Sequence, residues 1–344
     1  MNPFFVPILL PLSLLYGAAV WLRNKLFDTG ILTSARFDIP LISVGNIAVG
    51  GTGKTPHIEY LIEILSSEFK IAVLSRGYKR RSKGFRYVET ENLSHETGDE
   101  PLQIKRKYPQ TIVAVDANRK RGIERLLRDH PSLDVVLLDD AFQHRRIAPS
   151  LNIVLVDCNR PFWNDFMLPA GGLRDCPSSL CRADIILISK CSPDISTEER
   201  RQLTAKLKKY GKLVYFGYFE ADKPFPLLDQ LATFDASHLI ALSGIANPQH
   251  FTAMLAQLYP EAEIERLSFA DHHNFTEKDL KLISQKTKNQ TIVTTEKDSM
   301  RLRSYFYENP NSLARRIFYI PVKAQIIDAS NFNQNITEHV RKNK

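Results

Sequence analysis

A glycine-rich loop between an apolar run and a helical pattern constrains this chain more than any other feature. Residues 48–55 read Ala-Val-Gly-Gly-Thr-Gly-Lys-Thr, after the apolar run 39–44 and before the helix-forming run 57–65. Glycines let successive backbone N–H groups turn toward phosphate oxygens, and the following helix adds its positive end. In this pattern the lysine reaches the β- and γ-phosphates and the threonine hydroxyl binds Mg²⁺. The segment predicts a nucleoside triphosphate site, formed by Ala48, Val49, Gly50, Gly51, Thr52, Gly53, Lys54 and Thr55.

Short apolar runs alternate with helical patterns over the first two thirds of the chain. Strand-like runs lie at 39–44, 71–74, 112–115, 135–138, 153–156 and 185–188, and amphipathic stretches include 101–107, 119–128 and 197–209. Nearly continuous apolar strands that alternate with helices indicate a parallel sheet covered on both faces. We therefore predict an α/β fold with a P-loop NTPase-like sheet. Its ligands are expected beyond the carboxyl ends of the strands.

The chain of 344 residues is long enough for two domains. The pattern loosens over 212–235, where Pro224 and Pro226 stand close together, and this stretch is interpreted as a linker. A second α/β set follows, with strands at 239–242 and 291–293 and helices at 248–258 and 276–286. We expect an N-terminal apolar segment at 1–30, a P-loop core at 31–215 and a smaller α/β domain at 216–344 that closes the cleft.

The net charge and the cysteine content indicate an anionic ligand and reduced thiols, but they do not identify the ligand. The net charge of +8 suits a nucleotide, a phosphorylated substrate, an acidic membrane or nucleic acid. The four cysteines show no CxxC spacing. This favours reduced thiols over a disulfide framework or a zinc site.

The uncharged stretch 4–22 is followed directly by Arg23 and Lys25. A secretory signal would instead place positive charges before its apolar core and a cleavage site after it. The length just suffices for a membrane span, although prolines and a glycine weaken a straight one. One helical face carries Leu12, Leu15, Tyr16, Ala19 and Leu22, as in a helix that lies in the interface. We expect membrane contact; the alternative is a helix buried against the core.

Paired acids end one of the predicted strands. Asp139 and Asp140 follow the apolar run 135–138, where a carboxylate of a P-loop protein completes the Mg²⁺ shell. The alternative is a helix cap. Gln143 and His144 come shortly after them, in a basic cluster suited to a phosphorylated acceptor.

Three other segments allow a plain and a functional interpretation. Asp99 and Glu100 precede a helix, for which capping is the plain interpretation, with Asp99 as N-cap. Arg76 follows the strand 71–74 and either contacts phosphate or lies in a solvated turn. Asp271-His272 opens a predicted helix and can bind a metal, transfer a proton or cap that helix; a metal is disfavoured because no third ligand has metal spacing.

The sequence also bears on whether the nucleotide is ATP or GTP, because it has no good match to the guanine-recognition motif. A guanine-specific site requires Asn-Lys-x-Asp after a late strand. Residues 189–194 are one residue too long for it, and residues 295–298 place Lys beside Asp. ATP is therefore favoured over GTP.

Taken in chain order, these pieces resemble one family, the tetraacyldisaccharide 4'-kinases of lipid A synthesis. The resemblance covers nearly the whole chain, and the joint order of the motifs is specific. The matching segments are residues 44–56, 74–78, 98–101, 138–145, 168–174, 243–248, 271–272 and 295–298.

The resemblance implies transfer of the ATP γ-phosphate to the 4'-hydroxyl of an acylated glucosamine disaccharide 1-phosphate. It implies Asp99 as the base for the acceptor proton and His272 as its support, with Lys54 and Mg²⁺ neutralising charge. Its Mg²⁺-side candidates are Thr55, Glu100, Asp139 and Asp140, and its acceptor-side candidates are Arg76, Gln143, His144 and Arg174. The cofactors implied are ATP and Mg²⁺.

Two departures from the family pattern stand out. Asp116 and Arg119 are separated by two residues where the family has Asp-Arg, so Arg119 is left out of the predicted site. Gly172 stands where proline is frequent.

A lipid acceptor also implies a location at the cytoplasmic side of the inner membrane, with the 4–22 segment and its basic flank holding the enzyme there. Neither nucleic acid nor an obligate protein partner is expected.

Two rival functions remain open from the residues. A soluble P-loop small-molecule kinase or ligase would keep its activity without residues 1–25. A non-enzymatic nucleotide switch or metal-insertion chaperone would tolerate Asp99→Ala.

Overall fold

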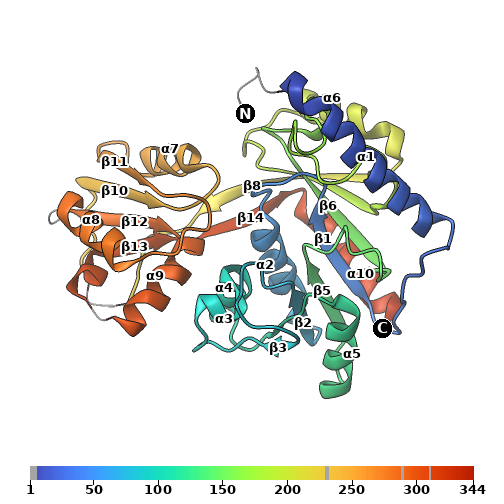
Figure 1. Cartoon of the computed structure of the whole chain (residues 1–344), viewed down its shortest axis with the longest axis horizontal. Helices are drawn as coiled ribbons and strands as arrows, with labels where there is room; N and C mark the ends of the chain where they lie inside the picture. The colour runs from blue at the N-terminus through green and yellow to red at the C-terminus, as the bar shows by residue number, and fades with distance from the viewer. Residues whose placement is uncertain (1–5, 229–231, 288–289, 310) are drawn as a thin grey trace.

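Two β-sheets, each with its own helices, form two lobes (Figure 1). The computed structural model describes residues 6–228, 232–287, 290–309 and 311–344. Residues 4 and 5 of the predicted apolar segment, and residues 229–231 of the predicted linker, lie outside the described residues.

The larger lobe contains a nine-stranded sheet in the order β14-β8-β7-β6-β1-β5-β2-β4-β3. Neighbouring strands are parallel except at the edges, where β14 pairs antiparallel with β8 and β3 with β4. The prediction of a P-loop NTPase-like parallel sheet is confirmed, and all six predicted strands lie in it. The strands are β1 (Leu41–Asn46), β2 (Ile71–Ser75), β3 (Arg86–Tyr87), β4 (Ile112–Val115), β5 (Val135–Asp139), β6 (Leu151–Asp157), β7 (Ile185–Ser189), β8 (Leu213–Ala221) and β14 (Val322–Ile327).

Helices cover both faces of this sheet because successive strand residues point to opposite sides. On one face Ile42 and Val44 pack in a cluster with helices α2, α4 and α10. On the other face Leu41 and Leu138 pack with α5, and the β6–β7 region packs with α6. The helices of this lobe are α2 (Lys54–Leu65), α3 (Ser94–Thr97), α4 (Asp99–Lys107), α5 (Arg119–Asp129), α6 (Thr197–Leu207) and α10 (Ala329–Asn343), with short 3-10 turns at Phe162–Asn164, Pro177–Arg182 and Lys208–Tyr210.

The smaller lobe is a five-stranded sheet in the order β11-β10-β12-β13-β9. Its strands are parallel except for the edge strand β9. The elements predicted at 239–242, 248–258, 276–286 and 291–293 are all present. The lobe comprises β9 (Phe225–Pro226), β10 (His238–Ser243), α7 (Pro248–Leu258), β11 (Glu263–Ser268), α8 (Glu277–Thr287), β12 (Thr291–Thr295), α9 (Glu296–Glu308), a 3-10 turn at Ser312–Arg316 and β13 (Ile317–Ile320).

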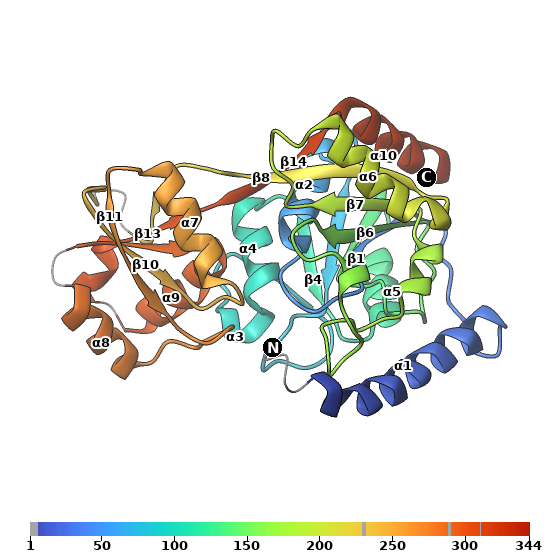
Figure 2. The same ribbon diagram turned by 90° about the horizontal axis from the view of Figure 1, so that it is seen from above.

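The chain crosses between the lobes twice, and this differs from the predicted division at residue 215. The stretch interpreted as a linker contains β8, a nine-residue strand of the larger sheet. After β13 the chain returns, because β14 pairs with β8 over six residues and α10 packs its Phe332 and Ile336 into the larger core. Figure 2 shows β8 and β14 running side by side between the lobes. Residues 322–343 thus belong to the larger lobe.

The N-terminal helix α1 (Val6–Asp28) is attached to the larger lobe through its polar side chains. Its buried residues are Ser13 and Asn24. The Ser13 hydroxyl accepts a hydrogen bond from Ala170 N at 2.9 Å, and Asn24 Nδ2 donates to Asp175 Oδ1 at 2.8 Å. Figure 2 shows α1 lying along the outside of this lobe.

The apolar side chains of α1 face outward instead. Leu12, Leu15 and Leu22 are 54%, 69% and 54% exposed, and only 6% of the most apolar window is buried. Among the described residues, α1 is the one helix long and apolar enough to cross a membrane. The alternative of a helix buried against the core is not what the structure shows.

A buried polar network fixes the smaller lobe against the larger one. Gln103 of α4 donates from Nε2 to Glu59 of α2 at 2.8 Å and to Glu296 of α9 at 3.2 Å. Lys107 Nζ lies 2.6 Å from Glu59 Oε2 and 3.7 Å from Glu296 Oε2. Buried carboxylates require such partners. The helix after the glycine-rich loop is therefore linked through α4 to the smaller lobe.

Candidate active site

The glycine-rich loop curls at the carboxyl end of β1. Gly50 has φ 109° and Gly53 has φ 87°, in the region that favours glycine. Gly53 is also the N-cap of α2, and a Cβ there would lie 2.1 Å from Cζ of Phe219 on β8. Conformation and space both require glycine at this position, so β8 helps to shape the loop.

Neighbouring strand ends hold the loop in place. Asn46 Nδ2 donates to Thr52 Oγ1 at 2.9 Å, and Ser189 Oγ at the end of β7 donates to Thr52 O at 3.0 Å. Val49 N donates to Gly172 O at 2.7 Å. Lys54 and Thr55 begin α2, directly behind the loop. The loop is thus pre-formed by contacts from three other segments.

Asp139 ends β5 beside the loop, and Asp140 follows it with φ 50°. Asp140 Oδ1 lies 3.9 Å from Lys54 Nζ, and Arg174 contacts both Asp140 carboxylate oxygens. Burial opposes the charge of Asp140, but Lys54 and Arg174 outweigh it and lower its pKa to about 2.

The surroundings of Asp139 fit a divalent cation. Burial, reinforced by Glu100 and Asp140, raises the pKa of Asp139 to about 7. Its Oδ2 accepts a hydrogen bond from Ser75 Oγ at 3.0 Å, whereas Oδ1 is buried without a hydrogen-bond partner. The residues that the structure describes contain no group of three or more His, Cys, Asp and Glu placed to hold a metal by themselves. The free Oδ1 of Asp139 suits Mg²⁺, which usually takes one or two carboxylates and completes its shell with phosphates and water.

Basic side chains gather beyond Asp140. His144 is partly buried, and burial together with the charges of Arg119, Arg76 and Arg23 lowers its pKa to about 4. Gln143 Nε2 donates to Asn46 O at 2.8 Å, which places this side chain beside β1. Cations that crowd a neutral histidine favour an anionic ligand.

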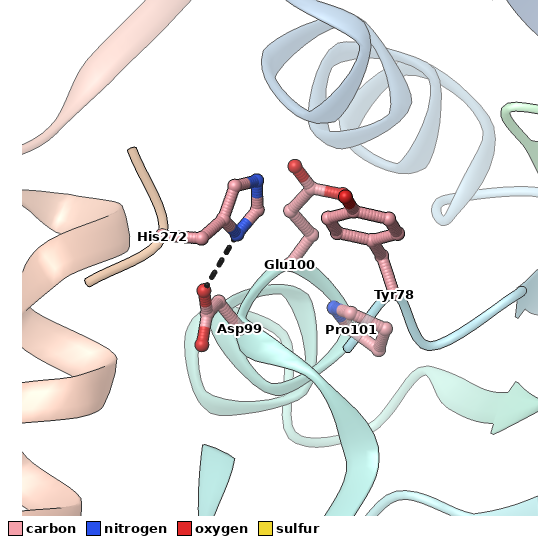
Figure 3. Close-up of a pocket in the computed structure, with 5 residues that line it drawn as sticks. All are labelled: Tyr78, Asp99, Glu100, Pro101 and His272. Carbon is pink, nitrogen blue, oxygen red and sulfur yellow. Dashed lines mark ion pairs between the residues drawn. The ribbon is translucent and has the colours of Figure 1, made fainter. Parts of the chain in front are cut away.

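Asp99 and His272 meet across the two lobes. Asp99 is the first residue of α4, and His272 lies in the loop between β11 and α8 with φ 58°. His272 Nδ1 is 3.4 Å from Asp99 Oδ2, and the two residues line a small pocket with Tyr78, Glu100 and Pro101 (Figure 3). The Tyr78 ring packs edge-on to His272, with 5.0 Å between the ring centroids.

Lys297 of α9 determines which nitrogen of His272 carries the proton. Lys297 Nζ lies 2.8 Å from Glu100 Oε1 and 3.1 Å from His272 Nε2. Burial disfavours the charge of Lys297, but Glu100 and Asp99 raise its pKa, so it remains an ammonium with no lone pair. A neutral His272 would accept from this ammonium at Nε2 and carry its proton on Nδ1, the nitrogen nearer to Asp99.

The structure brings most of the predicted residues to one region. Lys54, Thr55, Asp139, Asp140, Gln143 and Arg174 adjoin the loop, and Asp99, Glu100 and His272 line the small pocket. Two local interpretations change: Gly98 rather than Asp99 is the N-cap of α4, and residues 271–275 lie in a loop rather than at a helix start.

Sequence reasoning missed several residues of this region. Arg119 is buried and donates to Asp116 O and Asp139 O, despite the altered spacing that had excluded it. Tyr78, Lys297 and Arg301 also went unpredicted as site residues. Tyr78 and Lys297 belong to the quoted motifs, so their position there was the available signal; Arg301 gave none, because one arginine in a charged helix is common.

Comparison with known proteins gives one consistent result. The family model Tetraacyldisaccharide-1-P 4'-kinase (LpxK) matches residues 5–341. The Tetraacyldisaccharide 4'-kinase of Phocaeicola vulgatus is 43% identical over 352 residues, which cover 97% of this chain and 95% of the relative. That of Flavobacterium johnsoniae is 40% identical over 341 residues, which cover 98% and 97%. The crystal structure of "apo" form LpxK from Aquifex aeolicus in complex with ATP matches with TM-score 0.76 and 28% identity, over 98% of this chain and 99% of that one.

Proposed function

This chain belongs to the Tetraacyldisaccharide-1-P 4'-kinase family, and from its site we propose how it transfers the ATP γ-phosphate to the 4'-hydroxyl of a tetraacyl disaccharide 1-phosphate. The observation that carries the proposal is the meeting of Asp99 and His272 at 3.4 Å, one from each lobe. Glu100 lines the same pocket as this pair and acts electrostatically on Asp139, which supports a single site that extends from the pair to the glycine-rich loop. The smaller lobe then closes the cleft and supplies His272.

On the donor side, the loop N–H groups and the N-terminus of α2 receive the ATP phosphates, and Lys54 contacts the transferring group. Of the four candidates, Thr55 and Asp139 would hold Mg²⁺, which supplies charge neutralisation at the phosphates. Asp140 is paired with Arg174 and Glu100 with Lys297, so these two carboxylates would act from outside the metal shell. The buried, partnerless Asp139 Oδ1 supports this assignment. The Arg174 contact keeps Asp140 charged and oriented.

On the acceptor side, Asp99 takes the proton of the 4'-hydroxyl. A sugar hydroxyl is a poor nucleophile at neutral pH, so a positioned base is chemically useful. His272 Nδ1 lies 3.4 Å from the Asp99 carboxylate, where a proton on this nitrogen would support the base. Arg76, Gln143 and His144 would contact the acceptor, and the cations around His144 suit its 1-phosphate.

We also place the enzyme at the cytoplasmic face of the inner membrane. The outward-facing leucines of α1 suit an acyl-chain environment, and Arg23 and Lys25 suit anionic headgroups. Two other side chains of α1 contact the same region as the acceptor residues: Tyr16 Oη donates to Arg174 O at 3.1 Å, and Arg23 donates to Gln143 O at 2.6 Å. Docking of α1 on a bilayer thus brings the acceptor side to the lipid.

Family membership supports the lipid kinase over the two rival functions. A soluble small-molecule kinase or ligase gives no role to the exposed apolar surface of α1. A non-enzymatic chaperone gives none to the Asp99–His272 pair.

The direct test is an assay of purified protein with Mg-ATP and tetraacyl disaccharide 1-phosphate in detergent micelles. We expect a bis-phosphorylated lipid that carries the new phosphate at the 4' position, identified by mass spectrometry. A disaccharide blocked at the 4'-hydroxyl is the matched control and should give no product. Absence of product from the unblocked lipid, with bound ATP detected, would refute the proposed acceptor.

Membrane docking by α1 predicts a second result. Replacing Leu12, Leu15 and Leu22 by serine should lower partition onto anionic vesicles by roughly 100-fold, because each buried leucine contributes on the order of 1 kcal/mol or more. Vesicle flotation measures this. The same three changes at Leu213, Leu258 and Leu282, which are exposed elsewhere, should leave flotation intact. Equal flotation of both triple variants would contradict the proposed membrane surface.

A further inference from the structure

The buried guanidinium of Arg301 lies beside the proposed base and contacts the segment that carries its histidine. Arg301 belongs to α9 in the smaller lobe, and its side chain is only 2% exposed. A guanidinium removed from water requires charged or carbonyl partners for its N–H groups. The identity of those partners shows what this residue holds together.

One contact reaches the larger lobe. Arg301 Nε lies 3.1 Å from Asp99 Oδ2, as an ion pair without hydrogen-bond alignment, because this N–H has no hydrogen-bond partner. Asp99 Oδ2 is also the oxygen that His272 approaches. Arg301 and His272 therefore contact the same oxygen of the proposed base.

The other contacts of Arg301 reach the segment around His272. Its NH1 donates to His273 O at 2.9 Å, and its NH2 lies 3.0 Å from Asp298 Oδ1. Asp298 is fully buried and accepts hydrogen bonds from Gly244 N at 3.0 Å and Thr295 Oγ1 at 2.7 Å. Gly244 O in turn accepts from His272 N at 3.0 Å.

These contacts form a closed set around one strained residue. His272 has φ 58°, a conformation that a non-glycine side chain adopts only when its surroundings impose it. On one side, His272 N donates to Gly244 O, and Gly244 is held in turn by Asp298, the partner of Arg301. On the other side, Arg301 itself donates to His273 O. The backbone of His272 is therefore restrained on both sides. The same guanidinium thus orients His272 and the carboxylate that His272 faces.

We infer that Arg301 is a positioning residue for the phosphate transfer: it sets the orientation of Asp99 relative to His272 across the two lobes. The inference rests on the proposed role of Asp99 as base. A salt bridge that merely joins the lobes would affect stability and leave turnover of the folded enzyme unchanged. A positioning residue lowers kcat at saturating ATP and lipid, because misplacement by about 1 Å can cost roughly 100-fold in rate.

The test is a cycle of four proteins: wild type, Arg301→Gln, Asp99→Asn and the double variant. Arg301→Gln should lower kcat by roughly 10- to 100-fold with KM for ATP unchanged. In the Asp99→Asn background the same change should have no further effect, because the group it positions no longer acts. Arg303→Gln, the same substitution two residues along α9, is the control and should keep wild-type kcat; Arg303 packs over Tyr319 instead.

Arg301→Lys guards against loss of folding, since it retains the charge beside Asp99 and Asp298. Thermal unfolding shows which variants are folded. A single ammonium cannot reproduce the planar fork that reaches three partners, so kcat of Arg301→Lys should fall between wild type and Arg301→Gln. Wild-type kcat in either folded Arg301 variant, or an equal loss with and without Asp99, overturns the inference. A fully active Asp99→Asn overturns the proposed base instead, so the two failures are distinguishable.

Discussion

Asp99→Asn should lower kcat by roughly 10²- to 10⁴-fold, the range for loss of a positioned general base. Asparagine keeps the shape of the side chain, while its amide cannot take up the acceptor proton. KM for ATP should stay close to that of the wild type, because Asp99 begins α4 and the glycine-rich loop is built by β1, α2 and β8. Steady-state kinetics with the tetraacyl disaccharide 1-phosphate measures both quantities.

Asp129→Asn is a matched control for this prediction. Asp129 ends α5 and pairs with Arg125 on the same helix at 2.6 Å, so the same chemical change occurs away from the pocket. Its kcat should equal that of the wild type. If Asp99→Asn kept wild-type turnover while remaining folded, Asp99 would not be the base, although the family assignment would stand.

Lys54→Met should lower kcat by roughly 10²- to 10³-fold, as expected when one preorganised charge at the transferring phosphate is removed. The fold should tolerate the change, because Arg174 remains paired with Asp140 after the Lys54 ammonium is lost. Methionine also retains much of the apolar length of the lysine stem. Turnover and ATP binding, measured together, separate lost transition-state contact from lost binding.

Lys70→Met provides the comparison at a lysine that follows α2. Lys70 Nζ contacts Ser132 Oγ at 3.2 Å near the opposite ends of the strands, since Lys70 directly precedes β2. It should have wild-type kcat and wild-type ATP affinity. Near-normal turnover by Lys54→Met would exclude Lys54 from the transfer step.

The larger sheet was predictable because its information is local. Each apolar run is bounded by turns, and the loop at 48–55 fixes which strand end carries phosphate chemistry. The edges were not predictable in the same way. The sequence of residues 322–327 does not say which sheet this strand joins, and its pairing with β8 decides that the last helix returns to the larger lobe. A long-range pairing leaves no trace in local periodicity.

The orientation of α1 shows the same limit. Sequence periodicity identified an apolar face with Leu12, Leu15, Tyr16, Ala19 and Leu22. Its leucines are exposed, whereas Tyr16 is half-buried and donates a hydrogen bond to Arg174 O. Periodicity alone does not tell which face of the helix packs on the protein. In a soluble protein the apolar face would be buried, whereas here its leucines are exposed. The contacts of Ser13 and Asn24 decide it, because they provide specific hydrogen-bond partners for the polar face.

The sequence by itself determined the phosphate loop, the alternating fold and, through its resemblance to one kinase family, the reaction and most of the candidate residues. The tertiary structure decided how those residues act together. Asp99, His272 and Arg301 lie far apart along the chain, and they meet only because α9 of one lobe packs on α4 of the other around a buried polar network. The chemistry of each side chain follows from its residue type and can be read from the sequence. The geometry of a site between two lobes depends on how the lobes pack and on which partners neutralise the buried charges.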